Sequence, residues 1–246
     1  MKTIIFCFFT VITSFFIGKN DEAIIKQTEF VNNGFVKIGT NIYISKFEAT
    51  VKEYHNFLNS ERNKYSKFLY DSSLLKKSAV PQFEKYFNHP AYANCPIICV
   101  SYESALAYCD WLTIQYSKNP KAKFKNVKFR LPSPEEWKIS VDKELIDKNN
   151  RFVDTNLFYT NRMSNISLNL KPNYDPHFAI DVNSYKPNLL GLYNLIGNVA
   201  EMTTEKGKAK GGSWGDYITN CEINKFQIYS GPSSTVGFRV LMEIEN

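Results

Sequence analysis

Cysteine is the residue type whose number and spacing in this sequence bear most directly on chemistry. Four cysteines follow the apolar start of the chain: Cys95, Cys99, Cys109 and Cys221. Their even number allows disulfides in an oxidising compartment, and four cysteines permit three pairings between which the sequence does not choose. Pro96 and a short apolar run follow Cys95, so Cys95 and Cys99 are not a helical ligand pair, and we expect both to pack in the core.

Other common chemistries leave little trace in the sequence. The three histidines, His55, His89 and His177, have no spacing typical of a metal or catalytic site, and neither a Gly-rich phosphate loop nor a Ser/His/Asp grouping stands out. The formal charge of +6 comes from lysines and arginines scattered along the 246 residues. Such a distribution is typical of a solvated basic surface, and we expect no nucleic-acid partner.

Capping residues predict where three helices begin. Thr50 and Glu53 form a capping box, in which each side chain satisfies a free backbone N–H of the other residue. Ser101 is the expected cap of a second helix, and Ser133, followed by proline and by Glu136, of a third. Apolar residues recur at helical spacing behind the first two caps, so these helices each bury one face.

The rest of the chain predicts short strands and long loops. Residues 35–38 and 42–44 predict a hairpin, residues 96–100 a short buried strand, and residues 236–242 a last strand. Residues 149–188 are rich in Asn, Ser, Tyr and Pro, and a loop of that length in a compact domain is typically functional, stabilised by an ion, or a sign of helices or strands that the pattern does not reveal. No repeat or linker divides the chain, so we expect one domain.

Residues 1–18 have the composition of a signal peptide or an N-terminal anchor. Lys2 precedes an apolar run that ends at Ile17, which is the order found in secretory signals. The run is shorter than the about 20 residues of a transmembrane helix, and no other segment is apolar enough to span a membrane. We therefore expect an exported protein, periplasmic or associated with the bacterial cell envelope, in which residues 19–246 form a single domain with its core within 35–242.

Seven short strings then carry a resemblance to a known family. In chain order they are YISKFEAT (43–50), HPAY with PIICVSY (89–92 and 96–102), AYCDWL (107–112), RLPSPEEW (130–137), KPN with GLYNLIGNVAE (186–188 and 191–201), GGSW (211–214) and GFR (237–239). This series resembles the formylglycine-generating enzyme, or sulfatase-modifying factor, family. The resemblance implies an α+β fold, a variant of the C-type-lectin-like fold, that is poor in regular secondary structure and held together by turns and ions.

The resemblance also implies a calcium loop. Carried over position by position, the ligands are the Asn194 side chain, the carbonyl oxygens of Gly197 and Val199, and the Glu201 carboxylate. A hard cation prefers such oxygens, although an Asn-Gly turn without an ion is the alternative. A second calcium site is expected in the loop between residues 161 and 181, without assigned ligands. Arg239, between two apolar residues of a late strand, is expected to be a buried pairing residue rather than a substrate clamp.

The family's enzymes hold Cu(I) with two cysteines, and the resemblance assigns those positions to Asp216 and Cys221. Cu(I) is a soft ion that prefers thiolates, so the aspartate does not replace a cysteine and copper is not expected here. Cys221 is then either a disulfide partner of Cys109 or a buried free thiol. Ser213 is part of a structural turn or, in an enzyme, a neighbour of the reacting thiol.

Two functions follow from this resemblance. In the first, the chain is a non-catalytic exported module that binds a protein or glycan partner in the cell envelope. The stretch SGPSST before GFR is similar to that of gliding-motility and type 9 secretion lipoproteins of Bacteroidota, which carry this domain without the copper pair. In the alternative, Cys221, Ser213 and Asp216 form a divergent oxidase that converts a sulfatase cysteine to formylglycine.

Overall fold

The computed structural model describes residues 34–76, 85–141, 143–149, 151–152, 166 and 178–245. The expected signal peptide or anchor at residues 1–18 lies outside these residues, so the structure does not test the expected export. Most of the 149–188 loop also lies outside them. Among the residues described, no helix is long and apolar enough to cross a membrane.

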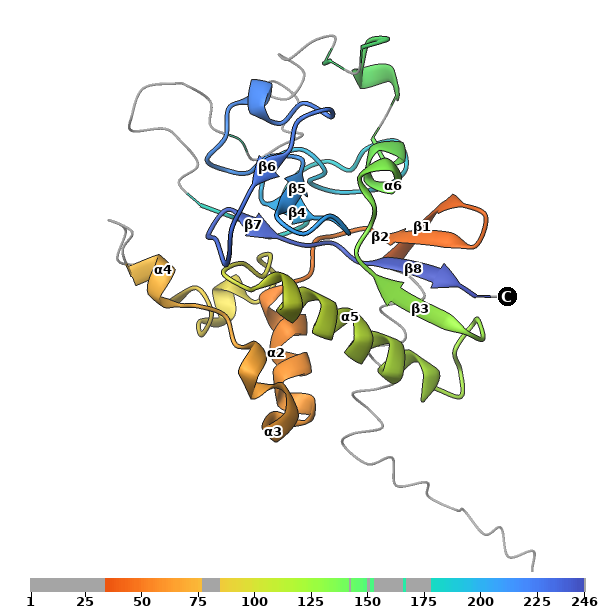
Figure 1. Ribbon diagram of the computed structural model, residues 1–246, viewed down its shortest axis with the longest axis vertical. Coiled ribbons are helices and arrows are strands. Elements are labelled where there is room, and N and C mark those ends of the chain that lie inside the picture. The colour runs from red at the N-terminus through yellow and green to blue at the C-terminus, as the bar shows by residue number, and fades with distance from the viewer. Residues whose placement is uncertain are drawn as a thin grey trace, which may run out of the picture.

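Two four-stranded sheets form the frame (Figure 1). The first is antiparallel and has the order β1 (Phe35–Gly39), β2 (Ile42–Ser45), β8 (Leu241–Ile244), β3 (Val127–Arg130). The second has the order β6 (Gln227–Ile228), β5 (Lys208–Lys210), β4 (Ala200–Met202), β7 (Val236–Gly237), and only β4 and β7 run parallel. The predicted hairpin is confirmed as β1 and β2. Asn41 makes its turn with a left-handed φ of 61°, a conformation that Asn tolerates well.

The three predicted helix starts are also confirmed. The helices are α2 (Val51–Ser60), α3 (Arg62–Tyr65), α4 (Ser73–Lys76), α5 (Tyr102–Ser117) and α6 (Pro134–Ile139), with short 3-10 turns at Ser66–Phe68, Pro90–Tyr92, Lys143–Leu145 and Ile218–Asn220. Thr50 and Ser133 each cap a helix through a complete capping box, and the Ser101 hydroxyl accepts from the backbone N–H of Ser104. These caps satisfy backbone groups that a helix end leaves free, which fixes where α2, α5 and α6 begin.

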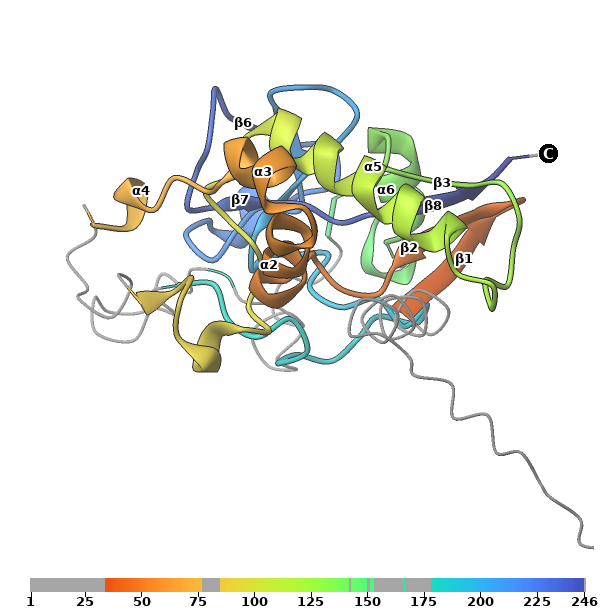
Figure 2. The same ribbon diagram turned by 90° about the horizontal axis from the view of Figure 1, so that it is seen from below.

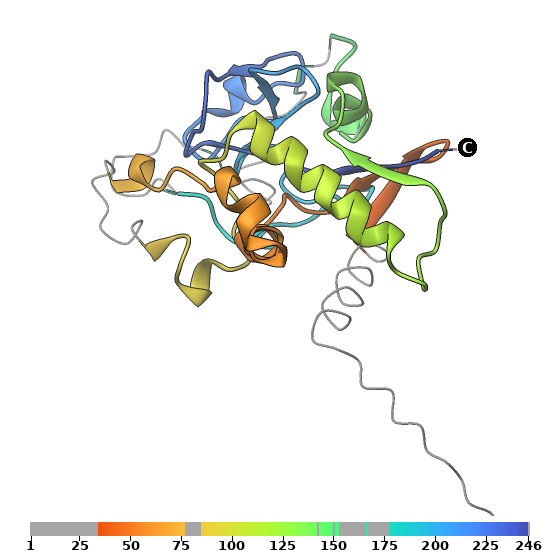
Figure 3. The same ribbon diagram turned by 60° about the horizontal axis from the view of Figure 1, so that its bottom comes forward.

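Aromatic side chains fill the space between the helices and the sheets. Helix α2 contacts α5 at a steep angle, and α5 packs against β3 (Figures 2 and 3). Tyr54 and Phe57 of α2 form one aromatic cluster with Tyr108 of α5 and with Phe238, in which the ring pairs have centroid distances of 5.3 to 6.4 Å. Such edge-to-face and stacked contacts add to the free energy gained by burying the rings. The segment after β7 is thereby anchored in the main core.

Two predicted strands are wrong. Residues 96–100 are fully buried but form only an isolated bridge between Pro96 and Thr50, because Cys99 adopts a left-handed φ of 58° that ends the extended run. Residues 236–242 are not one strand either. They supply β7 to one sheet and the start of β8 to the other, and the residues between the two strands cross from sheet to sheet. Arg239 lies in this crossing, at the junction of the two sheets.

Candidate functional site

Arg239 joins segments from three distant parts of the chain. Its side chain is completely buried, and its Nη1 donates to the carbonyl oxygens of Ser45 and Lys46, both at 2.8 Å. Its Nη2 donates to the carbonyl oxygen of Tyr193 at 2.6 Å and to Glu201 Oε1 at 2.7 Å. Its Nε lies 2.9 and 3.0 Å from the two Glu201 oxygens. The prediction of a buried pairing arginine is therefore confirmed.

The Glu201 carboxylate is fully occupied by its neighbours. It is completely buried, and besides the three contacts from Arg239 its Oε2 accepts from Trp137 Nε1 at 2.8 Å. A carboxylate offers about four lone-pair sites, and three N–H groups make four contacts with them, because Arg239 Nε is shared between the two oxygens. A fully buried charge is stable only when it is paired and hydrogen-bonded in this way.

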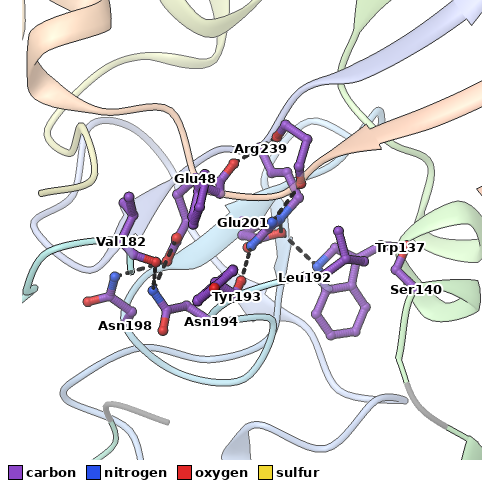
Figure 4. Close-up of polar contacts among 12 residues, drawn as sticks. Glu48, Trp137, Ser140, Val182, Leu192, Tyr193, Asn194, Asn198, Glu201 and Arg239 are labelled. Carbon is purple, nitrogen blue, oxygen red and sulfur yellow. Dashed lines mark hydrogen bonds and ion pairs between the residues drawn. The ribbon is translucent and has the colours of Figure 1, made fainter. Parts of the chain in front are cut away.

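Glu48 is a second buried carboxyl beside this pair (Figure 4). Its Oε1 accepts from Asn198 Nδ2 at 2.9 Å and its Oε2 from Asn194 Nδ2 at 3.3 Å. Burial raises the pKa of Glu48 to about 7, with Arg239 opposing the shift and Glu201 adding to it. Glu48, Glu201 and Arg239 together form what we call the buried triad.

Backbone contacts fix how the two asparagine amides face Glu48. The backbone N–H of Ile180 donates to Asn198 Oδ1 at 3.0 Å, so the NH2 group of Asn198 must face Glu48. The NH2 group of Asn194 donates to the carbonyl oxygen of Val182 at 2.9 Å as well as to Glu48. Its Oδ1 is left buried, with no hydrogen-bond partner among the described residues.

A glycine-rich turn packs directly against this loop. The backbone N–H of Gly197 donates to the carbonyl oxygen of Gly211 at 2.9 Å. A Cβ on Gly211 would lie 2.4 Å from the carbonyl oxygen of Leu195, and one on Gly212 would lie 2.3 Å from the sulfur of Cys221. Gly211 has a φ of +90° and Gly212 a φ of +67°, values at which a residue with a side chain is strained. The strings GLYNLIGNVAE (191–201) and GGSW (211–214) thus form one unit in the fold.

The turn brings Ser213 and Asp216 together. Asp216 Oδ2 accepts from the backbone N–H of Ser213 at 2.9 Å and from its hydroxyl at 2.6 Å. Ser213 is completely buried, so its hydroxyl is a structural donor to the aspartate. A carboxylate that closes a turn in this way shapes the backbone and leaves no nucleophile facing solvent.

Cys221 lies beneath the same turn as a buried thiol. Its sulfur makes a weak contact of 3.5 Å with the carbonyl oxygen of Tyr217. Burial, with help from Asp216, raises the pKa of Cys221 well above its usual range, although Lys225 opposes the shift. The thiolate, which is the nucleophile and the metal ligand, is therefore disfavoured.

A disulfide between Cys109 and Cys221, one of the two expectations for Cys221, is not formed in this structure. The four described cysteines are all free and buried. Cys109 belongs to the cluster under α2 and α5, whereas Cys221 belongs to a separate cluster around Trp137 and Ile218. Since the two thiols are buried in different parts of the core, the alternative of a buried free thiol describes Cys221.

Lys210, directly before the glycine turn, is a buried cation. Its ammonium donates to the carbonyl oxygens of Ile223 and Lys225 and lies 4.3 Å from the ring centre of Phe226. Only 3% of the residue is exposed. Burial, and secondarily the positive charge of Lys138, lowers the pKa of Lys210 to about 8.

Comparison with known proteins places this unit in a family. The model of the sulfatase-modifying factor enzyme 1-like domain matches residues 16–244, nearly the whole chain. The chain belongs to this family. No curated protein matches it.

Solved structures with the same fold show low sequence identity to this sulfatase-modifying factor domain. Treponema denticola variable protein 1 is 18% identical, with a TM-score of 0.56, and the match covers 85% of this chain and 91% of that one. CarF is 18% identical, with a TM-score of 0.55 and coverage of 83% and 87%. PvdO from Pseudomonas aeruginosa is 16% identical, with a TM-score of 0.53 and coverage of 82% and 80%. The expected α+β, C-type-lectin-like fold is confirmed.

The family's copper chemistry does not fit these residues. Asp216, to which the resemblance assigns the position of the first thiolate, accepts two hydrogen bonds from Ser213. Cys221, the second position, is a buried thiol whose pKa is raised. A single disfavoured thiolate beside a hard carboxylate does not make the two-thiolate site that Cu(I) prefers.

The family's calcium loop fits in part. Asn194 Oδ1 is a buried oxygen without a hydrogen-bond partner among the described residues, as a cation ligand would be, whereas both oxygens of Glu201 accept from Arg239 and one also from Trp137. Within the described ranges no three His, Cys, Asp or Glu side chains converge, so a cation at this loop would rely on amide and carbonyl oxygens. The stretch expected to hold a second calcium lies almost wholly outside those ranges.

Sequence reasoning missed Glu48 and Lys210. Glu48 lies between Phe47 and Ala49, just after a strand, and a lone acidic residue in such a buried setting is a signal of a paired or functional carboxyl. Lys210 follows Ala209 in a short strand and carries no comparable signal.

Proposed function

We propose that this chain is an exported sulfatase-modifying factor domain that binds a protein or glycan partner in the cell envelope and does not oxidise cysteine. A role in a secretion or motility assembly fits the similarity of its sequence to gliding-motility and type 9 secretion proteins. The proposal rests on one observation above all. At the position of the first copper thiolate, the Asp216 carboxylate is committed to Ser213.

The surroundings of Cys221 support the same proposal. An oxidase needs a thiolate that can reach copper and substrate, but the Cys221 thiol is completely buried and its pKa is raised. The Ser213 hydroxyl is likewise buried and points at Asp216. The residues that the alternative oxidase would use are therefore engaged in holding a turn.

The decisive experiment compares the purified protein with a variant that restores the thiolate pair. Both are incubated with Cu(I) and a peptide that contains the Cys-x-Pro-x-Arg motif, and mass spectrometry looks for the aldehyde. We expect no aldehyde and no tight Cu(I) binding for the wild type, and a gain in Cu(I) affinity for Asp216→Cys. Aldehyde formation by the wild type that is lost in Cys221→Ser would establish the oxidase instead.

The binding role needs its own test. Deletion of the gene in the source bacterium should impair a process of the cell envelope, and expression of Cys221→Ser should restore it as fully as the wild type does. Failure of this variant, with the protein still folded and exported, would show that the thiol has a function.

A further inference from the structure

The amide of Asn194 is held from one side only. Its NH2 group donates to Glu48 and to the carbonyl oxygen of Val182, whereas its Oδ1 is buried and lacks a partner among the described residues. Buried polar atoms are nearly always satisfied, so this oxygen indicates a missing partner. Asn194, Gly197 and Asn198 also have left-handed φ angles of 50°, 83° and 60°, and strained backbone of this kind clusters at ligand sites.

We propose that Glu48 is the positioning residue of a calcium site in the 194–201 loop. It holds the amide of Asn194 so that the amide oxygen faces the cation. The Glu201 carboxylate, which the family resemblance gives as a ligand, stays on Arg239 and takes no part. This assignment is independent of whether the domain is a binder or an oxidase.

Glu48 can do this because it accepts from both asparagines at once. Each of its oxygens faces one NH2 group, Oε1 that of Asn198 and Oε2 that of Asn194. If the Asn194 amide turned over, its oxygen would face Glu48 Oε2 and the carbonyl oxygen of Val182, two acceptors that repel it. The amide orientation is therefore set by hydrogen bonding rather than chosen arbitrarily.

The charges of the buried triad favour a cation at this place. Arg239 and Glu201 neutralise each other within the ion pair, so the charge of the triad as a whole is that of Glu48, and a nearby cation favours the ionised form of that carboxyl. A hard divalent cation accepts neutral amide and carbonyl oxygens as ligands when an anionic group is near. Asn194 thus supplies an oxygen ligand for Ca²⁺, and the ionised Glu48 behind it supplies the negative charge.

The Glu48→Gln substitution tests the assignment because glutamine has only one acceptor oxygen. That oxygen must face Asn198, whose orientation Ile180 fixes. The glutamine NH2 group then faces Asn194, which has to turn its own oxygen away from the ion and present a donor in its place. Glu53→Gln is the matched control, since it removes the same charge from the nearby capping box without touching the asparagines.

Calcium binding to the purified proteins is measured by isothermal titration, and the unfolding temperature is compared in Ca²⁺ and in EGTA. We expect the wild type and Glu53→Gln to bind Ca²⁺ alike. Asn194→Ala and Glu48→Gln should bind at this loop at least tenfold more weakly and lose the matching rise in unfolding temperature. If Glu48→Gln does not fold in EGTA, Glu48→Asp, which draws the oxygens back by one methylene, should show a smaller loss of affinity.

Three results would overturn the proposal. The first is a wild type that binds no Ca²⁺, in which case a buried water is the partner of Asn194. The second is wild-type affinity in Glu48→Gln or in Asn194→Ala. The third is an equal loss of affinity in Glu53→Gln, which would reduce the effect of Glu48 to general destabilisation.

Discussion

Replacing Glu201 by glutamine should destabilise the protein severely. The substitution leaves the shape of the side chain but removes the charge that faces the guanidinium of Arg239, which is completely buried. Three of the contacts that Arg239 makes and the single bond from Trp137 end on this carboxylate. Removing one partner of a buried ion pair costs about 3–5 kcal/mol. A domain typically has about 5–15 kcal/mol of stability in total, so the loss is a large share.

Urea unfolding followed by tryptophan fluorescence measures this loss. With a slope of about 2 kcal/mol per molar urea, the midpoint of Glu201→Gln should lie about 2 M below that of the wild type. Arg239→Met should cost a similar amount, because it strands the carboxylate instead. The double variant should be about as stable as either single one, since the two residues act as a pair and their effects do not add.

Repeating the Glu201→Gln measurement with and without Ca²⁺ is the control for this prediction. Because the acceptor sites of Glu201 are filled by protein donors, the free energy lost in Glu201→Gln should be the same in Ca²⁺ and in EGTA. A stability within about 0.5 kcal/mol of the wild type, the usual range for substitutions away from such features, would refute this prediction. It also fails if the loss is confined to solutions with Ca²⁺, since Glu201 would then be an ion ligand.

Three further predictions concern the glycine turn and its surroundings. The unfolded chain keeps the Lys210 proton up to pH 10.5 and the folded chain releases it near pH 8, so the unfolded state binds more protons in this window. The stability of the wild type relative to Lys210→Met should therefore rise by about 2–3 kcal/mol between these pH values in urea titrations, and a flat difference would contradict the burial argument. Gly212→Ala should lower the free energy of unfolding by at least about 2 kcal/mol, because the new Cβ meets the Cys221 sulfur and the backbone is left-handed. Adding Cys221→Ala to this variant should restore only part of the lost stability. In the native protein, Cys109 and Cys221 should not react with a thiol reagent that labels both after denaturation. The intact mass measured without reductant should show no disulfide between them. Rapid labelling of Cys221 in the native protein would refute its burial.

Local features of the fold could be predicted from the sequence because they depend on near neighbours. The boxes at Thr50 and Ser133 involve residues three positions apart, and the β1–β2 hairpin needs only a short turn with Asn41. The order of the seven strings was enough to identify the family, which the family model over residues 16–244 confirms. The assignment of Asp216 to a cysteine position also came from the sequence and stays a prediction.

The buried triad could be recognised only in the tertiary structure. Glu48 and Asn198 are 150 residues apart in the sequence, and Arg239 reaches Ser45 across 194 residues. No local pattern marks Glu48 as the acceptor for two asparagines, because that depends on how β2, the 194–201 loop and the crossing at Arg239 pack together. The same holds for Glu201, which sequence matching alone assigned to calcium.

The sequence by itself determined where three helices begin and which family the chain belongs to, because both depend on the identity of residues at fixed short spacings. The tertiary structure decided how residues 236–242 are divided between two sheets, that Cys109 and Cys221 lie in separate clusters, and which partner holds each buried charge. Those outcomes arise from contacts between distant segments, where the burial of a charge or a thiol is set by everything packed around it.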